Sequence, residues 1–593
     1  MKQQFKTLAF TVKMVFLIDK NLFFVIAFFT IITGVAPIIS LQITQNVLNN
    51  IQSMILPFNE VIKWIILYGV FTVFIMIIQN VSSHFITKFN IILTHKMKYE
   101  LMKKCSELSL ESLETTEIYD MISRLENEVE TKPFQSLMAI TGIFSSFGSL
   151  FLSGFIMFEW QPKLFLLIIL ISIIHCLGRL KITKKEFQMR FNRSDKEREL
   201  WYYSFLLMKD TAFKEVKVLN LKDYFLNRYL TLVNIFIEDE NNINKLGTFL
   251  NIVMAFIQDF MSFIVMFIAI REAYLGTILI GTALVYMSIT GIIQRSTQTL
   301  ANDIHLIYDS NLYMNLLNEF LNLEEHEKFG SFKIDGIKSI KVTQLSYNYP
   351  NQQEAIKNLN FEISKGERVA IVGENGSGKS TLLKLLCGLY QPTLGNIMIN
   401  EKKLSEISLN SYRKKISVLF QDFLKFEGSL LENVHIGFVE KNLQKESIKE
   451  ALELAQVNFL KDGHEYLYER YLGNWFKGGS QLSGGQWQKI ALARAYYKNA
   501  AVYFLDEPSS ALDVNAEIKI FKSFFQKSEN NIGIFITHRV KIAKQAEKII
   551  VMEKGEIVGI GNHQFLYENC KLYKDLLLKE QELNILENEE TIE

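Results

Sequence analysis

The sequence has few cysteines, few prolines and almost no net charge, and each shortage excludes a class of protein. Its four cysteines are scattered over 593 residues without a Cys-x-x-Cys pair: Cys105, Cys176, Cys387 and Cys570. This spacing fits neither a disulfide framework nor a zinc site. The net charge of +1 gives no general attraction to nucleic acid, so no nucleic-acid partner is expected. Only 7 residues are proline while 49% are hydrophobic, which argues against intrinsic disorder.

Hydrophobic residues are concentrated in the first half of the chain. A helix needs about 20 mostly apolar residues to cross the hydrocarbon core of a bilayer. Runs of this length are found near 22–43, 61–85, 136–158, 163–180, 249–270 and 275–294, and none follows residue 300. These runs are predicted to be helices, because backbone groups in lipid must be satisfied within the segment. The sequence therefore predicts a six-span membrane domain over 1–320, in contact with the lipid bilayer.

Two long charged inserts separate the spans and assign the sides of the membrane. Residues 86–135 and 181–248 look helical, so the spans are predicted to continue beyond the bilayer as two helical hairpins. The inserts carry seven and thirteen Lys or Arg, whereas 44–60 carries none. By the positive-inside rule, both inserts and both termini are cytoplasmic, which predicts a multi-pass protein of the cytoplasmic membrane.

One carboxylate stands out in the apolar half. Asp259 lies in the middle of the fifth predicted span, in FIQDFMSF beside Gln258. Intramembrane carboxylates usually face a cavity or a partner side chain rather than lipid. Asp259 is therefore a candidate for the substrate path, and a structural pairing with a neighbouring helix is the alternative.

The second half opens on a phosphate-binding pattern. After a predicted linker at 321–335, an α/β domain is predicted over 336–578, with an acidic tail at 579–593. The strand RVAIVG leads into GENGSGKST and then a helix, which is the context that GxxxxGK[ST] requires. The predicted ATP contacts are Gly373, Glu374, Asn375, Gly376, Ser377, Gly378, Lys379, Ser380 and Thr381. Lys379 is expected to reach the β- and γ-phosphates, and Ser380 to offer its hydroxyl to Mg²⁺.

Two further motifs complete the nucleotide chemistry. The strand AVYFLDEP ends in Asp506, expected to help hold Mg²⁺, and Glu507, expected to polarise the attacking water as general base. LSGGQ opens a helix and so offers a second anion-binding start, with predicted contacts Ser483, Gly484, Gly485 and Gln486. One nucleotide has one γ-phosphate, and the first loop already holds it. The second anion-binding helix start is therefore expected to contact the other nucleotide, which a partner domain brings to it.

Beside the other two motifs, LSGGQ resembles the signature of ABC ATPases. The resemblance implies that Gln421 in VLFQDF contacts Mg²⁺ and that His538 in FITHRV contacts the γ-phosphate. It also implies that Asp513 in SSALD lies near a dimer contact. Tyr349 in LSYNYP would stack on adenine, with Tyr347 as the alternative.

The whole chain resembles an ABC exporter half-transporter, six spans fused ahead of one ATPase domain. The resemblance implies an all-α membrane domain of the type I/IV exporter fold, followed by an α/β ATPase domain. It also implies ATP hydrolysis coupled to transport, in a pair of chains that meet head to tail. Residues 113–124 and 213–221 resemble the coupling helices that dock on the ATPase domains. Every motif is intact, so a homodimer is expected.

The cargo is the least specified feature. LGNWFKGGSQ before the signature resembles exporters of lanthipeptides and related bacteriocin-like peptides made on the ribosome. About 20 residues precede the first span, too few for a fused protease domain, so the resemblance is to peptidase-free exporters. The sequence predicts ATP-driven export of a small peptide. A multidrug or lipid exporter of the same fold is the alternative, and an ATP-gated channel is a third possibility.

Overall fold

The chain folds into two compact units, described separately below. The computed structural model describes residues 10, 13, 14, 16, 18–54, 57–323, 329–350, 354–508 and 514–590. Residues 1–106 and 120–323 form the first unit, and residues 107–119 and 324–593 form the second. The chain thus enters the second unit for thirteen residues before it completes the first.

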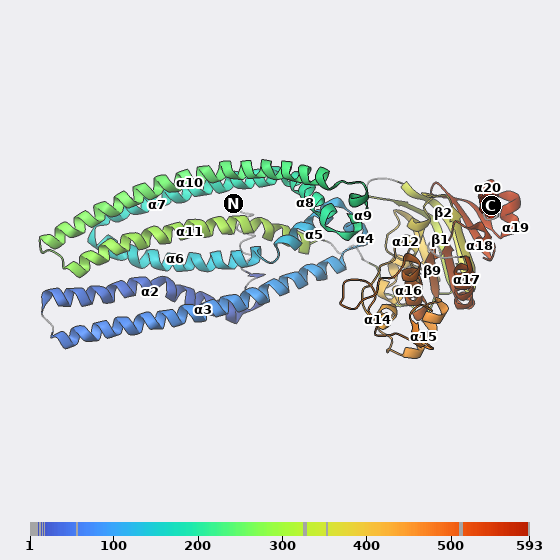
Figure 1. Ribbon diagram of the computed structural model, residues 1–593, viewed down its shortest axis with the longest axis horizontal. Coiled ribbons are helices and arrows are strands. Elements are labelled where there is room, and N and C mark those ends of the chain that lie inside the picture. The colour runs from blue at the N-terminus through green and yellow to red at the C-terminus, as the bar shows by residue number, and fades with distance from the viewer. Residues whose placement is uncertain are drawn as a thin grey trace. The chain divides into compact units, whose positions relative to one another are not determined.

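The first unit is built of helices (Figure 1). They are α2 (Lys20–Ser53), α3 (Phe58–Glu107), α6 (Lys132–Trp160), α7 (Pro162–Asn192), α8 (Ser194–Met208), α9 (Asp210–Val218), α10 (Lys222–Tyr274) and α11 (Ile280–Leu321), with most of α5 (Thr116–Glu128). Among the described residues, five helices are long and apolar enough to cross a membrane: α2, α3, α6, α7 and α10. Several continue well beyond the predicted spans, which agrees with the expectation of helical extensions.

The sixth predicted span lies in α11, which begins five residues later than predicted. The chain turns after α10 at Gly276, whose φ of +76° suits glycine. Several polar side chains follow the apolar run of α11, and some of them face the bundle. Gln294 Nε2 donates to Gln258 O of α10 (2.7 Å), and Gln298 Nε2 donates to Gln258 Oε1 (3.1 Å). The assignment of α11 as a span stays a prediction.

Apolar packing joins α11 to its neighbours α6, α7 and α10. The centre of this cluster is fully buried and includes Met157, Ile168, Val265, Ile289 and Ile293. By contrast, many large apolar side chains of α3 are exposed, as a surface that faces lipid requires.

The second unit contains a six-stranded sheet and a four-stranded sheet. The first has the order β12-β11-β3-β10-β9-β6, and its pairs are parallel except β11 with β12. Its strands are β3 (Arg368–Gly373), β6 (Ile416–Leu419), β9 (Val502–Asp506), β10 (Ile532–Ile536), β11 (Lys548–Glu553) and β12 (Glu556–Gly561). The second has the antiparallel order β2-β1-β4-β5, from β1 (Ser339–Asn348), β2 (Glu354–Ser364), β4 (Leu394–Ile399) and β5 (Lys402–Lys403).

Hydrophobic cores cover both faces of the parallel sheet, which explains why its strands are continuously apolar. Alternate residues of β3 enter different cores: Val369 and Ile371 lie in one, Ala370 and Val372 in the other. Helices pack around these cores, including α12 (Lys379–Leu386), α16 (Gly484–Tyr497) and α17 (Val514–Ser528). The predicted acidic tail is helical as far as Glu590, within α20 (Lys571–Glu590).

Candidate functional site

A hollow of about 520 Å³ lies where the parallel strands β3, β6, β9 and β10 reach their carboxyl ends. In open α/β sheets, ligands bind outside these ends. The hollow brings together many of the predicted site residues: Tyr349, Asn375, Gly376, Gly378, Lys379, Ser380, Thr381, Gln421, Glu507 and His538. Five segments of the sequence therefore meet at one place.

The loop between β3 and α12 makes a tight turn that depends on glycine at Gly378. Gly378 caps α12 with a φ of +98°, and a Cβ atom there would lie 2.8 Å from Ala355 O. Lys379 is buried, and its Nζ donates to the carbonyls of Gly373 (2.9 Å) and Glu374 (2.8 Å). Burial lowers the pKa of Lys379, while the carboxylates of Glu507 and Asp506 oppose this shift. A desolvated ammonium at a helix start favours an anionic ligand such as a phosphate.

Glu507 is held by groups from three other segments. Gln421 Nε2 donates to its Oε2 (2.9 Å), and His538 Nε2 pairs with its Oε1. Its main-chain carbonyl accepts a bond from Gln488 Nε2 (3.1 Å), on α16. Its backbone adopts a φ of +46°, which is uncommon for a residue with a side chain. The carboxylate is thus fixed at the carboxyl end of β9, at the position expected for a general base that activates a water molecule.

Asp506 provides a test of whether the site suits a cation. Its side chain is buried, and its Oδ1 has no hydrogen-bond partner among the described residues. Burial raises the pKa of Asp506 to about 6, although a hydrogen bond with Ser380 opposes the shift. A carboxylate, the Ser380 hydroxyl and the Gln421 amide form a set of hard oxygen donors. Mg²⁺ prefers such donors, so the residues present fit this ion.

The two candidate tyrosines have different surroundings. Tyr349 lines the hollow, and its hydroxyl lies 2.9 Å from Thr381 Oγ1. Tyr347 is 2% exposed and stacks on Tyr390, with the ring centroids 5.0 Å apart. Only Tyr349 is therefore placed where a base could stack on it.

The LSGGQ segment lies outside this hollow. Ser483 caps α16 in a reciprocal pair with Gln486: Gln486 N donates to Ser483 Oγ (3.3 Å), and Ser483 N donates to Gln486 Oε1 (2.9 Å). Ser483 and Gly484 are exposed, and no signature residue lines the hollow. The prediction for Asp513 falls outside the described residues.

A short helix from the first half of the sequence belongs to the second unit. α4 (Leu110–Leu113) packs Leu110 against the core behind β3. The carboxylate of Glu114 accepts bonds from Tyr390 OH (2.7 Å) and from Lys384 Nζ (3.3 Å). Both of these residues follow the phosphate-binding loop in sequence. The contact therefore begins a few residues before the predicted range of 113–124.

The structure places Asp259 on an exposed face of α10, whereas its neighbour Gln258 is buried. In the part of the chain that the structure describes, the Asp259 side chain forms no hydrogen bond or ion pair. A pairing with a helix of the same chain is therefore not observed, and the assignment of Asp259 to the substrate path stays a prediction.

Two sequence families match the chain. The family described as the ABC transporter transmembrane region matches residues 22–297, and the family described as ABC transporter matches residues 356–510. The subtilin transport ATP-binding protein SpaT of Bacillus subtilis is 42% identical over 99% of this chain and 96% of its own length. The chain belongs to the ABC transporter family.

Further relatives of this ABC transporter differ in how much of the chain they match. The nisin transport ATP-binding protein NisT of Lactococcus lactis subsp. lactis is 37% identical over 97% of the chain and 96% of its own length. The ATP-dependent lipid A-core flippase of Acinetobacter baylyi is 32% identical, but over only 51% of the chain and 52% of its own length. A bacterial Atm1-family ABC exporter with ATP bound has the same fold, with a TM-score of 0.79 at 19% identity over 97% and 98% of the two chains.

This transporter is therefore a multi-pass membrane protein with an ATPase domain fused behind its helical domain, and it couples ATP hydrolysis to export. Sequence reasoning did not identify Gln488 as a contact of Glu507, nor Glu354, Lys357 and Lys554 as lining residues. For Gln488, the one indication in the sequence was its position in the helix that begins at LSGGQ.

Proposed function

We propose that this protein exports a small peptide of the lanthipeptide or bacteriocin kind across the cytoplasmic membrane. The observation that carries the proposal is likeness across both halves. The relatives named for subtilin and nisin align over 99% and 97% of the chain, whereas the lipid A-core flippase aligns over 51%. The membrane half is where cargo passes, so a match that includes it is informative about cargo.

The ATPase site supplies the driving force. ATP provides the phosphoryl group whose hydrolysis drives the cycle. The loop amides and Lys379 bind the phosphates, and Tyr349 offers its ring to the base. Ser380, Gln421 and Asp506 would hold Mg²⁺ through their oxygens. Glu507, oriented by His538 and Gln421, would accept a proton from the attacking water.

A homodimer completes this machinery. The signature at Ser483–Gln486 lies outside the hollow of its own chain, so a second copy would bring its signature to that hollow. A two-fold interface makes two such sites from one kind of chain. The short helix α9 and the residue that follows it leave Phe213, Val218 and Leu219 exposed, which supports a docking contact there with another chain. Both termini are cytoplasmic, as the basic inserts require.

Uptake into inside-out vesicles tests the cargo. We expect ATP-dependent accumulation of subtilin or nisin, and stimulation of ATP hydrolysis by the same peptides. Glu507→Gln vesicles are the control, because they bind ATP without steady turnover. ATP-driven uptake of hydrophobic dyes without any peptide uptake would instead favour the multidrug exporter.

A further inference from the structure

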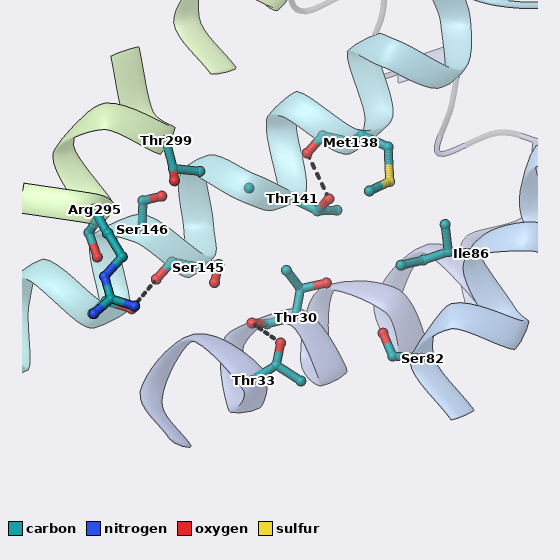
Figure 2. Close-up of a pocket in the computed structure, with 13 residues that line it drawn as sticks. Thr30, Thr33, Ser82, Ile86, Met138, Thr141, Ser145, Ser146, Arg295 and Thr299 are labelled. Atoms are coloured by element: carbon teal, nitrogen blue, oxygen red, sulfur yellow. Dashed lines mark hydrogen bonds between the residues drawn. The ribbon is translucent and has the colours of Figure 1, made fainter. Parts of the chain in front are cut away.

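A second hollow, of about 290 Å³, lies within the membrane half and is lined mainly by hydroxyls (Figure 2). It is enclosed by α2, α3, α6 and α11. Its large apolar lining residues are Ile86 and Met138, and none of its described lining residues carries a carboxylate. A polar hollow between helices of spanning length is unusual, because such surfaces generally pack with apolar side chains.

Three serines that line the hollow are largely buried, and their hydroxyls have no hydrogen-bond partner among the described residues. Ser82, Ser146 and Ser296 are 6%, 4% and 9% exposed, and none forms a hydrogen bond with the described residues. Other hydroxyls of the same hollow are satisfied: Ser149 Oγ, for example, donates to Gly34 O (2.6 Å). None of the three hydroxyl oxygens is fully enclosed by protein, so each can donate a hydrogen bond to a group that enters the hollow.

The hollow also holds a cation without an anion. Arg295 of α11 is exposed and forms no ion pair within the part of the chain described here. Asp303 lies two turns further along α11, but its Oδ2 is buried against Gly142 without a hydrogen-bond partner. It forms no ion pair with Arg295. A guanidinium beside hydroxyl donors is a good receptor for a planar anion.

We propose that this hollow binds a carboxylate of the exported peptide, with Arg295 as its cation and Ser82, Ser146 and Ser296 as hydrogen-bond donors. The inference rests on the proposed function and names the group that the membrane half recognises. The volume admits a side chain or a chain terminus rather than a whole peptide. A lipid phosphate shares the same chemistry, so the experiment includes an arm for it.

The experiment compares subtilin with subtilin whose carboxyl groups have been converted to amides. Binding is measured without ATP, on the full-length protein in nanodiscs of phosphatidylcholine. The carboxylate form is expected to bind about ten-fold more tightly, because charge-assisted hydrogen bonds are lost in the amide. Arg295→Gln should abolish this preference and Arg295→Lys should retain part of it. Arg271→Gln, in the last turn of α10, is the matched control and should keep the preference in full.

A triple variant separates recognition from structural roles. Ser82→Ala, Ser146→Ala and Ser296→Ala together remove hydroxyls that have no protein partner, so the unfolding temperature should not fall while the carboxylate preference does. Equal binding of both peptide forms to the wild type, or an undiminished preference in Arg295→Gln, would overturn the inference. The inference would also be overturned if the wild type bound neither peptide form. Dissociation of the Arg295→Gln variant into a smaller species on gel filtration would overturn it too.

The remaining arms distinguish the alternatives. Nanodiscs containing phosphatidylglycerol test the lipid: Arg295-dependent binding of this lipid, with no preference between the peptides, would assign the hollow to lipid phosphate and overturn the inference. ATP-driven uptake of both peptide forms without preference would also overturn it, while leaving peptide export in place. Carboxylate preference without any uptake would support the site and contradict export.

Discussion

At the scale of single residues, the carboxylate proposed as the base has a backbone conformation that few residues other than glycine adopt. A φ of +46° at Glu507 costs of the order of 1–3 kcal/mol for a residue other than glycine. Its amide donates to Ile536 O (3.2 Å), and Gln488 holds its carbonyl. Two neighbouring segments thus keep Glu507 in a conformation that directs it between Gln421 and His538.

Glu507→Gln should separate binding from turnover. The amide keeps the shape and can still accept from Gln421, so ATP should bind, whereas hydrolysis should fall by roughly 10²–10⁴ without the base. Phosphate release and binding of a fluorescent ATP analogue measure the two effects. Lys379→Ala should instead weaken binding. Hydrolysis at the wild-type rate in Glu507→Gln would contradict the assignment.

A half-buried lysine makes the stability of the ATPase domain depend on pH in the alkaline range. Burial lowers the pKa of Lys498 to about 8, while its Nζ donates to Arg413 O (2.6 Å). Between pH 8 and 10 the folded state then binds fewer protons than the unfolded state, so the contribution of Lys498 to stability rises with pH. Over this pH range, the unfolding temperature of the wild type should rise relative to that of Lys498→Met. Lys522→Met, at an exposed position of α17, should show no such trend.

Motif spacing was enough to place most of the phosphate-binding loop at the hollow, because the loop is short and Gly376 and Gly378 can adopt the positive φ angles of its tight turn. It could not choose between Tyr347 and Tyr349, since both lie near the end of the same strand. The hydroxyl hollow escaped prediction for another reason. Ser82, Ser146 and Ser296 come from three helices, and a serine in an apolar run gives no sign of what it faces.

At the scale of secondary-structure elements, the types of helix and strand followed from the sequence better than their faces did. Long apolar runs predicted the helices of the first unit, and strand–loop–helix patterns predicted β3 and α12. The side that Asp259 occupies on α10 was not predictable, because a helix exposed to lipid is apolar on every face. α11 begins later than predicted, since hydrophobicity alone does not mark the turn at Gly276.

The α4 segment offers a test of coupling. Glu114→Ala removes the two bonds from Tyr390 and Lys384, each a contribution of about 1 kcal/mol, without touching the nucleotide hollow. ATP binding should stay unchanged, while the amount of peptide transported per ATP falls several-fold. Glu117→Ala removes an exposed acid one turn further along and is the matched control. Equal transport by both variants would contradict a coupling role for Glu114.

At the scale of the whole molecule, the homodimer predicts complementation between two inactive chains. Lys379→Ala disables the phosphate-binding loop, and Gly485→Asp disables the signature by placing a carboxylate at its anion-binding helix start. Each variant alone should form a dimer with two defective sites. A mixed dimer contains one site in which both halves are intact, so co-expression should restore a measurable part of the ATPase activity.

The proportions of the mixture make the outcome quantitative. Random pairing gives mixed dimers as half of the population, and each has one working site of two. Activity up to about a quarter of the wild type is the expected ceiling if sites act independently. No recovery, with mixed dimers shown to be present by differently tagged chains, would contradict head-to-tail sites.

Thirteen residues from the first half of the sequence belong to the second unit, and this affects where the protein can be cut into separate domains. Residues 107–119 are an insertion from the membrane half, and they cover Tyr390 and part of the core behind β3. Residues 324–593 expressed alone would lack that cover. A chimera with a relative's ATPase domain joined at residue 324 would pair α4 of one parent with a surface shaped for the other. Exchanging 107–119 together with the domain should restore expression and activity, so the transplantable module is discontinuous in sequence.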